Sequence, residues 1–164
     1  MQSDIDAMAL PTPEHIGVIV KNIDETVEFL SSTLGLGPWL ISEHSFLKDE
    51  MWAGEPFSIK AAHARLGSVV LELLQPLREG SLWGQFLETK GEGLHHIAFC
   101  IPNWEEVVAK LKEQGSKMLW GSRFDGKRVC FFETKPGGII IEIDEQGTHD
   151  RLWKELEDLR RRTR

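Results

Sequence analysis

Two stretches of this chain decide its fold: HIGVIVKNIDE (15–25) and HIAFCIPNWEE (96–106). In both stretches a His-Ile pair opens an apolar strand of about six residues, and an Asn follows the strand with a Glu three positions later. That Asn and Glu spacing is typical of a capping box at the start of a helix. The chain therefore contains an internal repeat, which predicts two similar structural modules.

The later parts of the two halves also resemble each other. GSVVLE (67–72) and GIIIE (138–142) both consist of a turn glycine and an apolar run that ends in Glu. Further strands are expected before these glycines, and amphipathic helices are expected after the two Asn residues. The expected helices are 26–34 and 107–114, and the expected strands are 39–46, 58–66, 118–122 and 128–133. Each half therefore predicts the order β-α-β-β-β.

The repeat also predicts the domain organisation. We expect an α+β fold in which residues 14–145 form one domain of two tandem βαβββ modules that share a cleft. The modules span about 14–77 and 94–145, and a linker helix at about 81–89 joins them. The tail 147–164 carries leucines and a tryptophan at helical spacing, which predicts a docked C-terminal helix.

The bulk composition argues against several classes of protein. The chain has 164 residues, 41% of them apolar and 27% charged, which suffices for a sizeable core. Its net charge of -7 gives no support to a nucleic-acid role, and the basic cluster at 160–162 reads as the solvated end of the tail. No apolar run approaches the roughly 20 residues that span a bilayer, and residues 1–10 do not resemble a signal peptide. We expect a cytoplasmic protein without a membrane partner, in which Cys100 and Cys130 are buried free thiols.

Corresponding residues of two such modules face each other if the modules pack around an approximate twofold axis. His15 corresponds to His96, and Glu72 corresponds to Glu142. Two imidazoles and two carboxylates in one cleft form a site for a divalent transition metal, with positions left open for water or substrate. Both glutamates lie inside apolar stretches, where a carboxylate is costly to bury unless it is paired or binds a metal. The sequence therefore predicts one ion of Zn, Ni, Co, Fe or Mn held by these four side chains.

The register of the repeat separates His96 from its neighbour His95. The pair His96-Ile97 matches the pair His15-Ile16 at the start of the first strand. Because successive residues of a strand point to opposite faces, we expect only His96 of the two neighbours to bind the metal.

These segments resemble the vicinal oxygen chelate superfamily (glyoxalases, bleomycin resistance proteins and dioxygenases), and within it the methylmalonyl-CoA epimerase-like branch. The segments that carry the resemblance are HIGV (15–18), ELLQPL (72–77), GEGLHHIAF (91–99) and PGGIIIE (136–142). The resemblance implies a glyoxalase-like fold, in which paired βαβββ modules form an open β-sheet cup around a metal that the four predicted ligands bind. It also implies a homodimer that acts on a small-molecule substrate.

One position departs from that branch. The resemblance implies a catalytic glutamate on the third strand of the first module, and Ala61 occupies that place here. Ala61, His63 and Arg65 share one face of the expected strand. We therefore expect His63 to be a replacement acid/base, because imidazole suits proton transfer at neutral pH, and Arg65 to clamp an anionic substrate. Glu142 is expected to combine metal binding with a catalytic role.

Aromatic residues supply the remaining substrate contacts. Trp39 and Trp120 are expected to contact the substrate, and Trp52 and Trp83 are further candidates for an apolar pocket, although core packing is the commoner role of tryptophan. Three polar residues of the second strand and its loop are weaker catalytic candidates that read as surface charges: Glu43, His44 and Glu50.

The expected reaction is removal and return of a proton alpha to a carbonyl, assisted by the metal as a Lewis acid. The chain is then a metal-dependent epimerase or isomerase of a small acyl or hydroxycarbonyl compound, or of an acyl-CoA such as methylmalonyl-CoA. Two alternatives stay open. An Fe(II) ring-cleaving dioxygenase needs two His and one carboxylate, so the fourth ligand, Glu72, disfavours it. A protein that sequesters an apolar or antibiotic ligand would use the cup without turnover.

Overall fold

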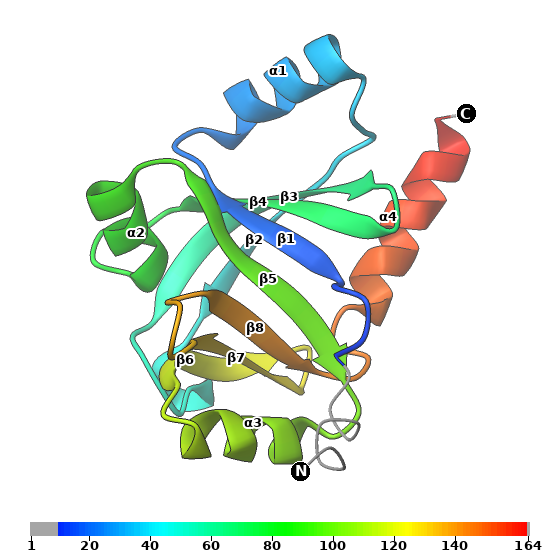
Figure 1. The fold of residues 1–164 in the computed structure, drawn as a ribbon. Coiled ribbons are helices and arrows are strands. Elements are labelled where there is room, and N and C mark those ends of the chain that lie inside the picture. The colour runs from blue at the N-terminus through cyan, green and yellow to red at the C-terminus, as the bar shows by residue number, and fades with distance from the viewer. Residues whose placement is uncertain (1–9, 164) are drawn as a thin grey trace.

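One mixed sheet of eight strands organises the molecule in the computed structural model, which describes residues 10–163. The strand order is β2-β3-β4-β1-β5-β8-β7-β6, so the first strands of the two modules lie side by side at the centre. The sheet curls into a half-barrel (Figure 1). The predicted α+β cup of two βαβββ modules is therefore confirmed.

The first module contains four strands and one long helix. They are β1 (His15–Ile19), α1 (Ile23–Leu34), β2 (Leu40–Phe46), β3 (Phe57–Leu66) and β4 (Val69–Pro76), with a short 3-10 helix at Lys48–Glu50. The second module repeats the order. It consists of β5 (Gly93–Ile101), α3 (Trp104–Glu113), β6 (Lys117–Phe124), β7 (Lys127–Glu133) and β8 (Ile140–Glu145). The helix α2 (Leu82–Lys90) links the modules, and α4 (Asp150–Arg162) follows the second module.

Strand directions are the same in the two modules. β1 runs parallel to β4 and β5 runs parallel to β8, whereas the other neighbours within each module are antiparallel. β1 and β5 pair antiparallel across the module boundary, with His15 opposite Ala98 and Gly17 opposite His96. An antiparallel junction between two equivalent strands relates the modules by an approximate twofold axis, so equivalent residues approach each other at the centre of the sheet.

The two module helices begin three residues before their predicted starts. Asn22 accepts hydrogen bonds from two backbone N–H groups of the first turn, so it caps α1 as predicted, but its side-chain amide rather than its backbone N–H donates to Glu25. Asn103 differs, because it donates to the Glu106 side chain but makes no side-chain bond to the backbone of α3. The predicted starts were late because apolar periodicity marks where a helix packs, whereas the capping residue marks where it begins.

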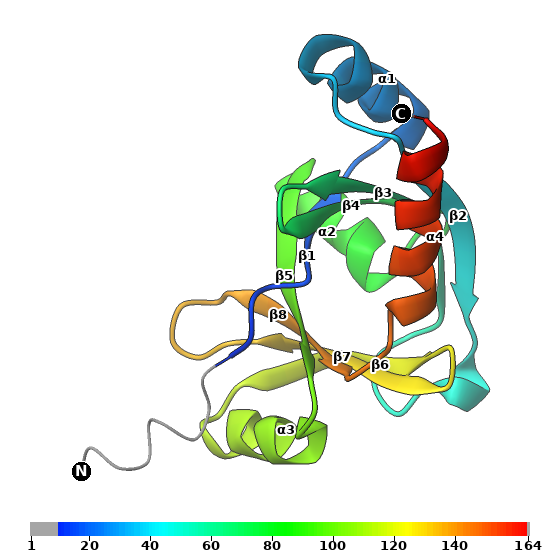
Figure 2. The same ribbon diagram turned by 90° about the vertical axis from the view of Figure 1, so that its right-hand side faces the viewer.

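Each strand presents alternate residues to the outside and the inside of the curl. On the outside, α1 covers a cluster that includes Ile23 and Leu73, and α3 covers a cluster that includes Phe132 and Ile143. The two helices lie at opposite ends of the molecule (Figures 1 and 2). The inside carries a third cluster rich in aromatic rings, which includes Phe57, Trp83, Trp120 and Phe131.

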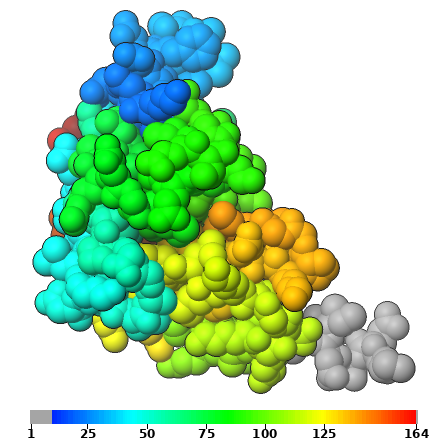
Figure 3. All heavy atoms as spheres, turned by 90° about the vertical axis from the view of Figure 1, so that its left-hand side faces the viewer, coloured from blue at the N-terminus to red at the C-terminus, as the bar shows by residue number. Residues whose placement is uncertain are grey.

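α2 and α4 cover two further sides of the sheet. Ser81 caps α2 by accepting a hydrogen bond from the backbone N–H of Gly84, and the helix inserts Trp83 into the inner cluster. On that side of the molecule the green surface of α2 lies between the blue α1 and the yellow-green second module (Figure 3). α4 runs along the opposite side next to β2 and buries Leu152 and Leu156 (Figure 2).

The helices within residues 10–163 are short. The longest of them, α4, has 13 residues. None of the described helices is long and apolar enough to cross a membrane.

Phe132→Ala is expected to lower the free energy of unfolding by about 3–5 kcal/mol, because it empties a fully buried site beneath α3. Phe29→Ala is the matched control, since this ring on α1 is 60% exposed and its loss should change stability by less than about 0.5 kcal/mol. Urea unfolding of both variants measures the difference. Equal losses would contradict the packing of Phe132 in the outer core.

Candidate metal centre

The four predicted ligands lie on the four central strands of the sheet. His15 opens β1 and His96 lies on β5, while Glu72 lies on β4 and Glu142 on β8. These strands are contiguous in the order β4-β1-β5-β8. The four residues, here named the ligand cluster, come from matching positions of the two modules, and the antiparallel junction turns them toward one another.

The ligand cluster converges on one point. Nε2 of His15 lies 3.3 Å from Nε2 of His96. Oε2 of Glu142 lies 3.0 Å from the first nitrogen and 2.9 Å from the second, and Oε2 of Glu72 lies 3.4 Å from each. All four donor atoms lie within 4.8 Å of one another. Both histidines are fully buried and both glutamate side chains nearly so.

This spacing fits a single metal ion. Bonds of about 2.0–2.1 Å from nitrogen and oxygen place neighbouring ligand atoms about 2.9–3.4 Å apart when the ion has four to six ligands. The five distances within the cluster range from 2.9 to 3.4 Å. Imidazole and carboxylate donors suit Zn, Ni, Co, Fe or Mn. Donor chemistry and spacing therefore both match a site for one transition metal ion.

Burial and charge act against each other in the ligand cluster. Burial would raise the pKa of Glu142, but the charge of His15 and hydrogen bonds from both histidines hold it far below its usual value. Burial would lower the pKa of His96, but its hydrogen bonds to Glu142 and Glu72 raise it to about 9. Burial would also lower the pKa of His15, but the charges of Glu72 and Glu142 raise it. Burial would raise the pKa of Glu72, but the charge of His15 lowers it. Without a cation the carboxylates therefore keep the imidazoles protonated.

His95 lies behind the ligand cluster, toward α2. Its ring stacks on Trp83 with centroids 5.9 Å apart and meets Phe86 edge-on at 4.9 Å. Its Nδ1 lies 2.9 Å from Nδ1 of His96. Burial, and then the neighbouring His96, lower the pKa of His95 to about 3. His95 is therefore a neutral ring that supports the orientation of His96.

His63, the predicted acid/base, contacts one member of the ligand cluster. It lies opposite Glu72 in the β3–β4 pair, with its Nε2 2.9 Å from Oε1 of that carboxylate. The other oxygen of Glu72 faces the two histidines of the cluster. Nδ1 of His63 is buried and has no hydrogen-bond partner within residues 10–163. Glu72 thus links His63 to the ligand cluster, and Nδ1 of His63 remains without a hydrogen-bond partner within residues 10–163.

A cavity of about 50 Å³ lies beside the ligand cluster inside the cup, with space for a few water molecules or a compact acyl group. Both modules and α4 contribute to its walls, which are mostly apolar. Five polar side chains interrupt the apolar lining: His44, His63, Glu72, Glu142 and His149. The cavity therefore places a small apolar space directly against the candidate metal centre.

Two of the predicted substrate contacts, Trp39 and Arg65, lie away from this cavity. Trp39 precedes β2 and packs in the outer cluster beneath α1, where its indole N–H donates to the backbone oxygen of Leu36. Arg65 lies two residues beyond His63 on β3, nearer the turn at the end of the strand, and does not line the cavity. Trp120 does line it, as Trp83 does.

Among the weaker candidates, His44 lines the cavity at its β2 side, where its Nε2 lies 2.9 Å from the Ser42 hydroxyl. Burial lowers the pKa of His44, and the nearby His63 lowers it further. Glu43 and Glu50 are exposed and lie outside this cavity, and Trp52 is 43% exposed. Of these candidates, the structure therefore places only His44 at the cavity.

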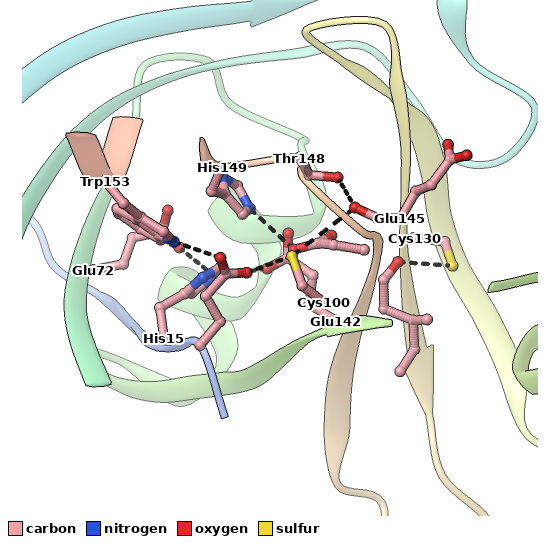
Figure 4. A network of polar contacts seen from close by, with 12 residues as sticks. His15, Glu72, Cys100, Cys130, Glu142, Glu145, Thr148, His149 and Trp153 are labelled. Carbon is pink, nitrogen blue, oxygen red and sulfur yellow. Dashed lines mark hydrogen bonds and ion pairs between the residues drawn. The ribbon is translucent and has the colours of Figure 1, made fainter. Parts of the chain in front are cut away.

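A second polar cluster adjoins the ligands and was not predicted. Asp144 lies two residues after Glu142 on the same face of β8, and its Oδ2 is 3.0 Å from Nε2 of His149. His149 sits in the turn before α4 and packs edge-on against His15, with ring centroids 5.3 Å apart (Figure 4). The alternation along β8 points to Asp144, but no local pattern points to His149.

Charge is shared within the second cluster as well. Burial would lower the pKa of His149, but its hydrogen bond to Asp144 raises it, while burial and the nearby Glu142 raise the pKa of Asp144. The two groups therefore share a proton. Beside them, Glu14 accepts hydrogen bonds from the indole of Trp153 and from the thiol of Cys100.

Known proteins resemble this chain over most of its length. Residues 14–131 match the family described as Glyoxalase/Bleomycin resistance protein/Dioxygenase superfamily. The chain is 33% identical over 138 residues to the Bacillus subtilis "Uncharacterized protein YqjC", covering 80% of this chain and 90% of the relative. It is 27% identical over 137 residues to an ethylmalonyl-CoA/methylmalonyl-CoA epimerase of Cereibacter sphaeroides, covering 80% of this chain and 95% of the relative. The structure of a Streptomyces coelicolor methylmalonyl-CoA epimerase variant with 2-nitronate-propionyl-CoA matches with a TM-score of 0.64 and 29% identity. The match covers 85% of this chain and 99% of the epimerase chain.

A curled sheet of two βαβββ modules with a polar centre at their junction defines a class of two-module cup proteins. The chain belongs to the glyoxalase/bleomycin resistance protein/dioxygenase superfamily, whose match covers more than half of it. The resemblance seen in the repeat is confirmed, and methylmalonyl-CoA epimerases are among the structural neighbours.

Gly17→Ala is expected to weaken metal binding about 10–100-fold, because a Cβ at Gly17 would lie 2.0 Å from Cε1 of His96 and displace that ring. Val18→Ala is the control, since Val18 packs on the other face of β1 beneath α1. Competition with a coloured chelator measures both affinities. Unchanged affinity in the Gly17 variant would contradict the role of His96 as a ligand.

Metal binding at pH 7 is expected to release about one to two protons per ion, because histidines that the carboxylates keep protonated must become neutral to bind a metal. The release should diminish as the pH rises through the His96 pKa of about 9. Titration calorimetry in buffers of different ionisation enthalpy counts the protons. Binding without proton release at pH 7 would show that the imidazoles are already neutral.

Proposed function

We propose that this chain is a divalent-metal-dependent epimerase or isomerase that transfers a proton alpha to a carbonyl group. The observation that carries the proposal is the ligand cluster, which converges beside a cavity that also presents His63. Removal of a proton from carbon needs a base near the substrate and positive charge near the carbonyl oxygen. The epimerases among the relatives support the same class of reaction.

The ligand cluster would hold the ion. Two imidazoles and two carboxylates suit Co, Ni, Zn, Mn and Fe alike. When bound, a divalent cation stabilises the negative charge that develops on the carbonyl oxygen as the alpha proton leaves. Glu142 combines two features, because it belongs to the cluster and also lines the cavity.

His63 is the acid/base of this proposal. Ala61, at the position where the resemblance implies a glutamate, lies on the same cavity wall and presents only a methyl group. His63 lines that wall two residues further along β3, and its Nε2 is held by Glu72. A carboxylate bound to one ring nitrogen fixes the tautomer and orients the other nitrogen. His63 is therefore equipped to take over the proton transfer.

The substrate is a compact acyl or hydroxycarbonyl compound, or the acyl part of a CoA thioester such as methylmalonyl-CoA. The apolar walls suit a short alkyl group. Trp83 and Trp120 line the cavity, and their buried indole N–H groups have no acceptor within residues 10–163. Such donors are costly to bury unpaired, so an oxygen of the substrate is their natural partner. As in the resemblance, we expect the protein to act as a homodimer.

Two other functions suit the fold less well. A ring-cleaving dioxygenase needs open metal positions, and Glu72 takes one of them at a distance that matches the other ligands. A binding protein is favoured only by the apolar walls of the cavity. Tight ligand binding by metal-free protein, with no turnover, would support that second function.

Elemental analysis of gently purified protein is expected to find about one divalent metal ion per chain, and much less in Glu142→Ala, which removes one of four ligands. Glu145→Ala is the matched control, because Glu145 lies on the same strand but pairs with Arg128 near the surface. Equal metal content in the Glu142 variant and the unmodified protein would refute the site.

The reaction is tested separately from the metal. Metal-loaded protein is expected to interconvert the epimers of methylmalonyl-CoA, and His63→Gln to slow this by about 10²–10⁴-fold. Chiral analysis of the product in time measures the rate. No interconversion by metal-loaded protein would remove the named substrate and leave the metal site standing.

A further inference from the structure

Epimerisation removes a proton from one face of a carbon and returns one to the other face, which two acid/base groups on opposite sides of the substrate can do directly. In the proposed function His63 acts on one side. The second polar cluster contains an imidazole that the proposed function does not use, His149, and this residue also lines the cavity.

His149 repeats the construction of His63. Its Nε2 is held 3.0 Å from Oδ2 of Asp144, as Nε2 of His63 is held 2.9 Å from Oε1 of Glu72. Both rings are buried, and Nδ1 of each lacks a hydrogen-bond partner among the described residues. A carboxylate that binds one nitrogen leaves the other available for proton transfer.

The two imidazoles come from different modules. His63 comes from β3 of the first module, whereas His149 comes from the turn after β8 of the second. The Trp153 indole lies 5.6 Å from the ring centroid of His63 and 5.2 Å from that of His149, so the two rings are at most about 11 Å apart. Both side chains line the same small cavity beside the ligand cluster.

The turn fixes His149 in this place. Thr148 donates both its backbone N–H and its hydroxyl to the carbonyl oxygen of Glu145, and Gly147 adopts a φ of 86°, which favours glycine. The chain thereby reverses at the end of β8 and points His149 back over Asp144. His149 is the N-cap residue of α4, yet its side chain bonds Asp144 rather than the helix backbone.

We propose that His149, oriented by Asp144, is a second acid/base group that acts on the side of the substrate opposite to His63. The inference rests on the proposed function. In one direction His63 takes the alpha proton, the C–H electron pair moves into the carbonyl system as an enolate, and protonated His149 returns a proton to the other face. The reverse direction exchanges the two roles. Asp144 is a positioning residue, since it acts through His149.

A competing interpretation of the second cluster is a second metal site. Glu14, His15, Asp144 and His149 also offer donor atoms within 4.8 Å of one another. Two contacts speak for the acid/base role instead: Glu14 is already bonded by Trp153 and Cys100, and His149 borders the cavity. The metal content of a His149 variant distinguishes the two interpretations.

The test follows each epimer of methylmalonyl-CoA separately in D2O with Co²⁺-loaded protein, and measures both alpha-deuterium incorporation and interconversion. His149→Gln should slow interconversion by about 10²–10⁴-fold. For one epimer, the rate at which His149→Gln exchanges the alpha proton should stay within about tenfold of the rate of the unmodified protein. The reason is that the remaining His63 removes a proton and returns one on the same face. His63→Gln should show the mirror-image result, with exchange retained in the other epimer.

Three further measurements make the result specific. Asp144→Asn should give the same epimer bias as His149→Gln with a smaller loss of about 10–100-fold, which a purely structural role would not produce. Arg151→Gln, at an exposed position of α4, should change neither rate. The metal content of His149→Gln should equal that of the unmodified protein, and the retained exchange shows that the variant is folded.

Each contrary result has a distinct meaning. Full interconversion by His149→Gln, or equal loss of exchange in both epimers, would overturn the inference and leave the proposed function intact. A second metal ion that is lost in His149→Gln would overturn it in favour of a two-metal site. Unmodified protein that exchanges neither epimer would overturn the proposed function for this substrate and the inference with it.

Discussion

Two carboxylates buried at the middle of a sheet constrain the rest of this structure. Glu72 and Glu142 lie between apolar neighbours on β4 and β8, and moving a lone carboxylate into such a place costs several kcal/mol. The cost is offset only if positive charge stands directly beside them. His15 and His96 meet that requirement from the adjacent strands when protonated, and a divalent cation meets it more fully. The antiparallel junction of β1 and β5 brings the two histidines together, and the missing side chain at Gly17 makes room for the His96 ring.

Much of the fold and of the ligand cluster was readable from the sequence because the repeat is local. A His-Ile pair, a strand of fixed length and a Glu that ends an apolar run each depend on a few neighbouring residues, and their recurrence supplies the long-range pairing. The repeat also separated His96 from His95, although both are buried. Strand alternation could also have predicted that Asp144 lies near the ligand cluster, since it shares the face of Glu142.

Other parts depend on contacts that no local pattern records. Trp39 has the size and chemistry of a cavity residue, but it lies before β2, where the chain still crosses the outer face toward α1. Arg65 shares a strand face with His63, yet the cavity ends before it. His149 lies in a turn, where neither helical nor strand periodicity applies, and its position depends on how α4 docks. Alternation predicts which face a residue takes, and only the tertiary structure decides how far along that face the site extends.

The site is closed by parts of the chain that are far apart in sequence. Trp153 on α4 reaches Glu14 and packs near both His15 and His63, so residues at the start of β1 and in the last helix meet over the same centre. Contacts between segments that are separated by most of the chain form slowly, because a long loop must close first. A chain folded only as far as β8 would thus already bring all four ligands together but would leave one wall of the cup missing. Pairing of the strands is therefore enough to assemble the ligand cluster, whereas the closed cavity also requires α4 to dock.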